Sequence, residues 1–96
     1  MSIPKRIKIG GIEYRVELVD PSFSTEHLGQ LEPLKCLIRI NKEISKDRQQ
    51  TTLLHEILEA INEQYQFELE HGKIQGLEAT LYQVLKDNNI YFGEDQ

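Results

Sequence analysis

Three side chains between residues 55 and 59 have types and spacing that suit metal chemistry. His55 is followed directly by Glu56, and Glu59 lies four positions after His55. Residues at positions i and i+4 lie one turn apart on the same side of a helix, so His55 and Glu59 can hold one metal ion. Glu56 can then act as a general base on a water bound to that ion. The usual zinc motif is His-Glu-x-x-His, and here a carboxylate, which also ligates zinc, replaces the second imidazole.

The segment that carries these side chains has the pattern of an amphipathic helix. Ser45 is a favourable N-cap, and a polar first turn and a half follows it. The apolar positions then recur with helical spacing as far as Tyr65 and comprise Leu53, Leu54, Ile57, Leu58, Ile61 and Tyr65. His55 and Glu59 lie at the edge of this apolar stripe, and Glu56 lies further round the helix.

A second helix is predicted from about Lys73 to Asn89, after a connector that contains His71. Its apolar side comprises Ile74, Leu77, Leu81, Val84 and Leu85. Glu78 lies within that apolar side, where a carboxylate needs a partner. A cation, His55 or a buried water can supply one.

The first half of the chain predicts strands. Residues 6–9 and 12–18 alternate between polar and apolar types, and the two glycines between them are typical of a hairpin turn. After a loop at residues 20–28, residues 29–32 and 36–40 predict a third and a fourth strand. We therefore expect an α+β fold, in which a small antiparallel sheet of three to four strands precedes two packed helices that cover one of its faces.

The length of the chain indicates one domain over residues 1–96, since 96 residues and 11.2 kDa leave room for a single core. Within it we expect a β-rich half at 1–44, a two-helix half at 45–90 and a tail at 91–96. No apolar run reaches the roughly 18 residues of a membrane span, and no signal peptide is recognised. The single cysteine, Cys36, excludes an internal disulfide and favours a reducing compartment. A cytoplasmic location is therefore expected.

The net charge of −5 is concentrated in the second half of the chain. Residues 55–96 contain two Lys or Arg and nine Asp or Glu, whereas residues 1–54 are slightly basic. An acidic surface of this kind disfavours nucleic acid as a partner and leaves a cation site or a solvated acidic face as alternatives. The spacing of His55 and Glu59 also allows two interpretations, a metal site or an ordinary i,i+4 side-chain contact on a helix surface.

At these residues the chain resembles the very small gluzincin-type zinc metallopeptidases of phages and mobile elements, which are related to ImmA/IrrE-type domains. The resemblance includes the early hairpin, the strand at 36–40, the helix around residues 50–58 and the helix around residues 81–88. It implies a minimal zincin-like domain in the cytoplasm of a bacterium or a phage-infected host cell. It also implies that a peptide binds at the edge of the strand that precedes the active-site helix.

The resemblance implies a role for each candidate residue. His55 matches the first zinc ligand, Glu56 the catalytic base, and Glu59 takes the place of the second histidine. The third ligand falls on Gln75, where the family has Glu, and Glu78 one turn later is a substitute for it. An amide oxygen is a weaker zinc ligand than a carboxylate, so low zinc occupancy and weak or absent peptidase activity are expected.

A second functional class is a non-catalytic protein-interaction module. Such a module would use an exposed sheet edge or the acidic helical face to bind a peptide or protein partner, and it would need no metal. Stoichiometric zinc in the purified chain favours the metallopeptidase-like protein, and absence of zinc favours the module.

Overall fold

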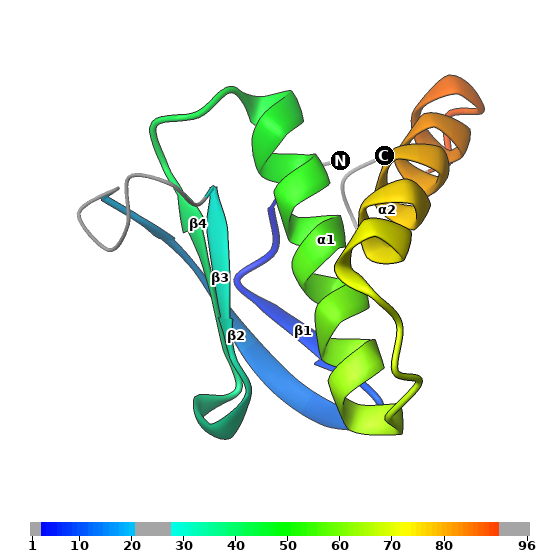
Figure 1. The fold of residues 1–96 in the computed structure, drawn as a ribbon. Helices are drawn as coiled ribbons and strands as arrows, with labels where there is room; N and C mark the ends of the chain where they lie inside the picture. The colour runs from blue at the N-terminus through cyan, green and yellow to red at the C-terminus, as the bar shows by residue number, and fades with distance from the viewer. Residues whose placement is uncertain (1–2, 21–27, 91–96) are drawn as a thin grey trace.

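The structure is a computed structural model that describes residues 3–20 and 28–90 of the 96-residue chain (Figure 1). Its strands are β1 (Arg6–Ile9), β2 (Ile12–Val19), β3 (Gly29–Glu32) and β4 (Leu37–Asn41). Two helices follow, α1 (Lys46–Tyr65) and α2 (His71–Asp87). The α+β class and the number of strands are confirmed. The predicted tail at residues 91–96 and most of the predicted loop at residues 20–28 lie outside the described residues.

The first two strands form the expected hairpin. Gly10 and Gly11 have φ angles of 60° and 83°, which glycine adopts without the steric cost of a Cβ atom. Gly10 also lies against the end of α1, because a Cβ atom there would be 2.0 Å from Oε1 of Gln64. The Gln64 amide donates hydrogen bonds to the carbonyl of Ile9 at 2.8 Å and to the hydroxyl of Tyr14 at 3.0 Å. The hairpin therefore fixes the C-terminal end of α1 on the sheet.

The sheet has the order β1-β2-β4-β3 and is mixed rather than antiparallel throughout. β1 pairs with β2, and β3 with β4, in antiparallel hairpins, but β2 and β4 are parallel. The alternating sequence pattern is the same for both directions, so it did not distinguish them. β4, the strand that precedes α1, lies between β2 and β3 and has no free edge, so the peptide-binding edge that the family resemblance implied for this strand is not there. β3 is an edge strand.

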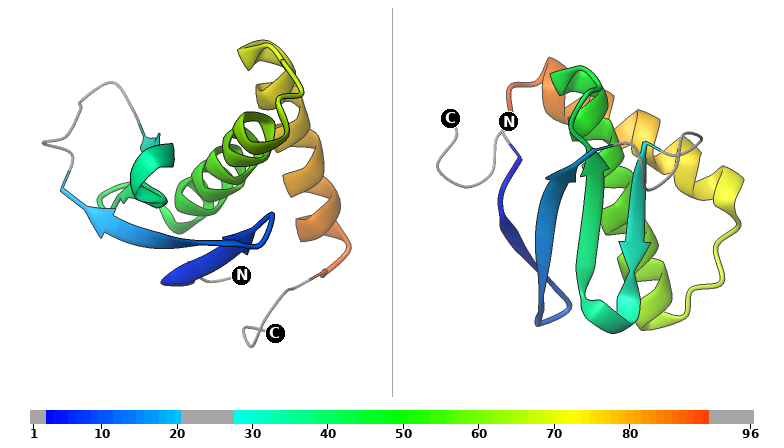
Figure 2. Two further views of the ribbon diagram at one scale, coloured as in Figure 1. Left: turned by 90° about the horizontal axis from the view of Figure 1, so that it is seen from below. Right: turned by 90° about the vertical axis from the view of Figure 1, so that its left-hand side faces the viewer.

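Helix α1 covers one face of the sheet, and α2 packs on α1 (Figures 1 and 2). The core between the sheet and α1 consists of Ile9, Tyr14, Val16, Ile38, Ile40, Leu53 and Ala60. The expectation that both helices cover the sheet is corrected, because α2 contributes one buried side chain, Ile74. Three of its other apolar side chains, Leu77, Leu81 and Val84, are 38–42% exposed, and Leu85 is half-buried. Neither described helix combines the length and apolar character that a membrane span requires.

The bounds of α1 agree with the prediction, but its buried side does not coincide with the apolar stripe. The Ser45 hydroxyl accepts a hydrogen bond from the Arg48 backbone amide at 3.2 Å and caps the helix. The side chains of α1 that are most buried are Gln49, Thr52, Leu53, Glu56 and Ala60. Sheet and α2 flank the helix on two sides, so its apolar stripe is shared between them. A Cβ atom at Gly29 of β3 would lie 2.4 Å from Cγ2 of Thr52, so this glycine permits the close approach of α1 to the edge strand.

Candidate metal centre

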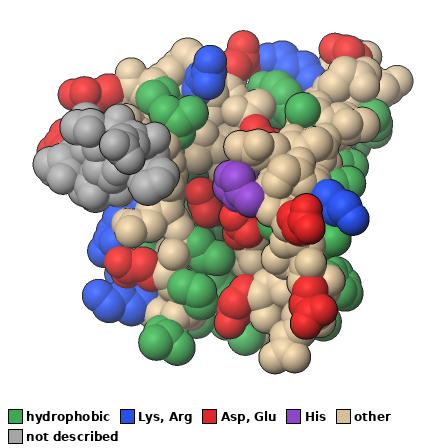
Figure 3. Space-filling model, in the orientation of Figure 1, with side chains coloured by type: hydrophobic (Ala, Val, Ile, Leu, Met, Phe, Trp, Pro, Cys, Tyr) green, Lys and Arg blue, Asp and Glu red, His purple; other side chains and the backbone are tan. Residues whose placement is uncertain are grey.

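A cleft of about 780 Å³ lies between the edge strand β3 and the two helices. The residues predicted from the sequence as site residues all line it, and they are His55, Glu56, Glu59, Gln75 and Glu78. Histidine lies beside acidic side chains on this face of the molecule (Figure 3). The fold thus brings the candidates from both helices to one water-accessible cleft.

His55 lies between two carboxylates. Its Nδ1 atom is 2.8 Å from Oε1 of Glu78, and its Nε2 atom is 3.5 Å from Oε2 of Glu59. The imidazole side chain is only 17% exposed. The predicted convergence of these three residues across the two helices is therefore confirmed. The two carboxylates contact different nitrogens of the ring, Glu78 at Nδ1 and Glu59 at Nε2.

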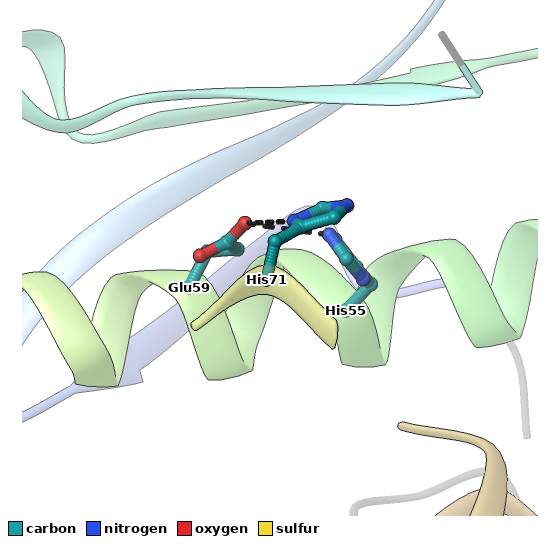
Figure 4. A group of neighbouring side chains, drawn as sticks. All are labelled: His55, Glu59 and His71. Carbon is teal, nitrogen blue, oxygen red and sulfur yellow. Dashed lines mark ion pairs between the residues drawn. The ribbon is translucent and has the colours of Figure 1, made fainter. Parts of the chain in front are cut away.

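His71 is the residue that the sequence prediction missed. It was assigned to the connector, but it is the first residue of α2 and lies beside His55 (Figure 4). Its Nδ1 atom is 3.4 Å from the same Oε2 atom of Glu59 that faces His55, and the two imidazole rings are 5.1 Å apart. A signal for it existed, because His71 lies seven positions before Glu78 and so on the same side of a helix.

The connection between the helices holds His71 in this place. The side-chain oxygen of Asn62 accepts a hydrogen bond from the Leu69 amide at 3.0 Å, and its amide donates to the Leu69 carbonyl at 3.3 Å. Gln66 and Glu68 have φ angles of 53° and 59°, in the left-handed region that tightens a turn. The chain therefore reverses sharply after α1, and the first turn of α2 returns over Glu59.

Gln75 lies one turn after His71. Its Nε2 atom is 3.3 Å from Nε2 of His71, with donor and acceptor roles that depend on the histidine tautomer. The residue that the family resemblance proposed as third ligand thus contacts the far nitrogen of a histidine whose other nitrogen faces Glu59.

Glu56 is the most deeply buried acidic side chain of the cleft and is 7% exposed. It points to the sheet side of α1, where a Cβ atom at Gly29 would be 3.2 Å from its Oε2 atom. The pKa of Glu56 is raised to about 7, chiefly by burial; the charge of His55 opposes this rise, and the charges of Glu59 and Glu78 add to it. Among residues 3–20 and 28–90, none donates a hydrogen bond to this carboxylate. Such a group exchanges a proton easily near neutral pH.

The geometry of His55, Glu59 and His71 suits a zinc ion. Their ligand atoms all lie within 4.8 Å of one another, and the two contacts of the Glu59 oxygen are 3.4 and 3.5 Å. Tetrahedral zinc with bonds of about 2.0–2.1 Å separates its ligand atoms by about 3.3–3.4 Å. Two imidazole nitrogens and one carboxylate oxygen are also a donor set that zinc accepts while keeping one position open for water.

No family model, curated protein or solved structure matches this chain. The resemblance to small gluzincins therefore rests on the residues quoted for it. Function has to be argued from the side chains of the cleft, because a fold of this class by itself does not define an activity.

Proposed function

We propose that this protein is a zinc-dependent hydrolase of the metallopeptidase type that acts on a peptide or protein. One observation carries the proposal: His55, which directly precedes the buried Glu56, lies between two carboxylates of the cleft, 3.5 Å from Glu59 and 2.8 Å from Glu78. A zinc ion held there would supply Lewis acidity and make a water nucleophilic near neutral pH.

Glu56 is the proposed general base. It removes a proton from the water as the water oxygen bonds to the peptide carbonyl carbon, and it returns that proton to the nitrogen as the C–N bond breaks. Burial, which raises the pKa of Glu56 to about 7 in the metal-free chain, makes this carboxylate easier to protonate, as the double role requires. Its burial beside Gly29 holds the carboxylate in one orientation.

The edge strand β3 supports a peptide as the substrate. It pairs with β4 on one side, and Gly29, Gln30 and Leu31 line the cleft. An extended peptide can add to such an edge by main-chain hydrogen bonds, which tolerate many side chains. A substrate bound in this way would lie along the free edge of β3, in the cleft that Glu56 also lines.

The expected weakness of the activity assumed that Gln75 or Glu78 completes the ligand set. Weak activity remains a prediction, because two effects on the proposed zinc site oppose each other. A carboxylate ligand makes a bound water less acidic than a neutral imidazole does, whereas His71 offers a second imidazole at the same oxygen. Two histidines and one carboxylate is a ligand composition of hydrolytic zinc sites.

The non-catalytic interaction module remains the second candidate, because one side of α2 exposes apolar side chains. Leu77, Leu81 and Val84 are each more than a third exposed on a helix that buries one side chain. Exposed apolar side chains in a row can bind a partner protein without a metal.

Metal content and peptide cleavage together test the proposal. The chain is purified without a chelator or a polyhistidine tag, its zinc is measured by mass spectrometry, and a mixture of unstructured peptides is assayed for new termini. We expect partial zinc occupancy and slow cleavage in the wild type, and Glu56→Gln should retain the zinc but lose about 10²–10⁴-fold in rate. Glu63→Gln, an exposed glutamate of the same cleft, is the matched control. Stoichiometric zinc without cleavage of any peptide would favour the module.

A further inference from the structure

We propose that His71 is the third protein ligand of the zinc site, which the chain forms from His55 and Glu59 of α1 and from the first residue of α2. This assignment rests on the proposed zinc-dependent function and names the residues that hold the ion. It differs from the ligand set implied by the family resemblance, in which the second helix contributes Gln75 or Glu78.

The contacts of Glu59 carry the assignment. Its Oε2 atom faces Nε2 of His55 at 3.5 Å and Nδ1 of His71 at 3.4 Å, so the two imidazoles approach one oxygen from different helices. All ligand atoms lie within 4.8 Å. His71 is 63% exposed and Glu59 29% exposed, so small rotations of both side chains can close the remaining distance without disturbing the core.

Glu78 is assigned a different task. It lies 2.8 Å from Nδ1 of His55, on the side of the ring opposite to Glu59. A carboxylate there keeps the proton on Nδ1 and directs the lone pair of Nε2 toward Glu59 and His71. We therefore treat Glu78 as a positioning residue. It orients His55 and does not itself contact the ion.

The charge of the cleft favours a cation. Glu56, Glu59, Glu63 and Glu78 line it, and Arg48 is the one arginine or lysine among the described residues that do so. Four carboxylates around two imidazoles create a negative potential that attracts a divalent ion. Mixed nitrogen and oxygen donors suit zinc and also cobalt, which allows a spectroscopic probe.

Cobalt titration of the metal-free, untagged chain tests the role of His71. We expect one ion per chain and the visible absorption bands of tetrahedral Co²⁺. His71→Ala should weaken binding by at least about 100-fold, since loss of a partner that merely orients a ligand already costs about 10–100-fold. Gln83→Ala is the matched control, because Gln83 is an exposed side chain of the same helix that contacts Asp87 and does not line the cleft, and it should change affinity by less than about threefold.

Two substitutions of Glu78 separate positioning from ligation. Glu78→Gln keeps an oxygen that accepts the hydrogen bond from Nδ1 of His55, so it should bind Co²⁺ within about tenfold of the wild type. Glu78→Ala should lose more, because the imidazole is no longer oriented. Glu59→Gln should show the larger loss expected of a ligand. Equal and large losses in Glu78→Gln and Glu59→Gln would identify Glu78 as a ligand.

Nitrogen-15 spectra of the histidine rings with bound zinc give a readout independent of affinity. We expect Nε2 of His55 and Nδ1 of His71 to shift on binding. Wild-type affinity and an unchanged cobalt spectrum in His71→Ala, with a folded chain by circular dichroism, would overturn the assignment and leave the proposed function standing. Absence of any metal binding by the wild type would overturn both. Metal binding as described with no peptide cleavage would contradict only the proposed function.

Discussion

Two buried polar side chains lie two turns apart on the sheet-facing side of α1, and their surroundings differ. Gln49 is 9% exposed, and its amide donates to the carbonyls of Lys42 and Ile44 at 3.2 and 3.3 Å. Glu56 is 7% exposed, and within the described part of the chain no residue donates a hydrogen bond to it. A buried polar group with partners stabilises a fold, whereas a largely buried carboxylate that no protein group binds is costly to ionise.

This difference in hydrogen-bond partners distinguishes a side chain whose burial stabilises the fold from one whose burial would serve the proposed chemistry. Gln49 ties the start of α1 to the segment that leaves β4, so its burial is explained by structure. Burial of Glu56 raises its pKa instead, which a protein tolerates where the group has a task. The same helix thus contains one buried polar side chain whose burial the fold explains and one whose burial the proposed chemistry would explain.

The largest expected effect is a gain of stability on replacing Glu56. Its pKa rises from 4.5 in the unfolded chain to about 7 in the folded one, so the folded state prefers the neutral acid. The stabilisation from this group in the metal-free protein should therefore be fully present below pH 4.5, and up to about 3 kcal/mol of it should be lost as the pH rises through 7. Glu56→Gln removes this loss. Urea unfolding of the metal-free chains at pH 5 and pH 8 should show the variant more stable than the wild type at pH 8 and nearly equal at pH 5.

Glu63→Gln again provides the matched control, because its carboxylate is exposed and its replacement should leave the pH profile unchanged. If Glu56→Gln were less stable than the wild type at pH 8, Glu56 would have a stabilising partner when ionised. The contrast with Gln49 would then be wrong.

Much of the fold could be predicted from local patterns. The Gly10-Gly11 turn, the Ser45 cap and the end of α1 at Tyr65 follow from residue types with specific backbone preferences. The parallel pairing of β2 and β4 could not be predicted, because the alternation of polar and apolar residues defines the two faces of a strand and not its neighbours in the sheet. The exposure of the apolar side of α2 could not be predicted either, since an amphipathic pattern does not indicate whether its apolar side faces the core or solvent.

The candidate site was predictable where its residues lie on one helix. His55, Glu56 and Glu59 are linked by spacing alone, and Glu78 by being a carboxylate among apolar neighbours. His71 depends on the reversal of the chain after α1, which Asn62 fixes through the backbone of Leu69. The spacing of His71 and Glu78 places both on one side of a helix, but the start of that helix at His71 depends on this contact between a side chain and the loop.

The second expected effect is a loss of stability on replacing Gln49. Gln49→Met keeps the approximate volume but removes the amide, so the carbonyls of Lys42 and Ile44 lose a buried donor. We expect a loss of about 1–2 kcal/mol in the free energy of unfolding, with little dependence on pH. The double variant with Glu56→Gln should be additive, because the positions are about 10 Å apart along the helix. An increase in stability, or strong coupling between the sites, would show that Gln49 is not a purely structural residue.

The smallest expected effect comes from the opposite, solvent-exposed side of α1 and has the opposite pH dependence. Asp47 accepts hydrogen bonds from Nζ of Lys86 and from the hydroxyl of Tyr82, so the first turn of α1 is joined to the end of α2. The hydrogen bond and charge of Lys86, followed by the Tyr82 hydroxyl, lower the pKa of Asp47 below 3.8. Its stabilisation is therefore complete above that pH and disappears as the pH falls through the lowered pKa. Glu56 changes stability in the other direction and between pH 4.5 and 7. In urea unfolding from pH 5 to pH 2, Asp47→Asn should flatten the acid limb slightly relative to the wild type, and Lys86→Met should do the same without a further change in the double variant. An acid limb that is identical in wild type and Asp47→Asn would mean that the contact between the helices does not depend on this charge.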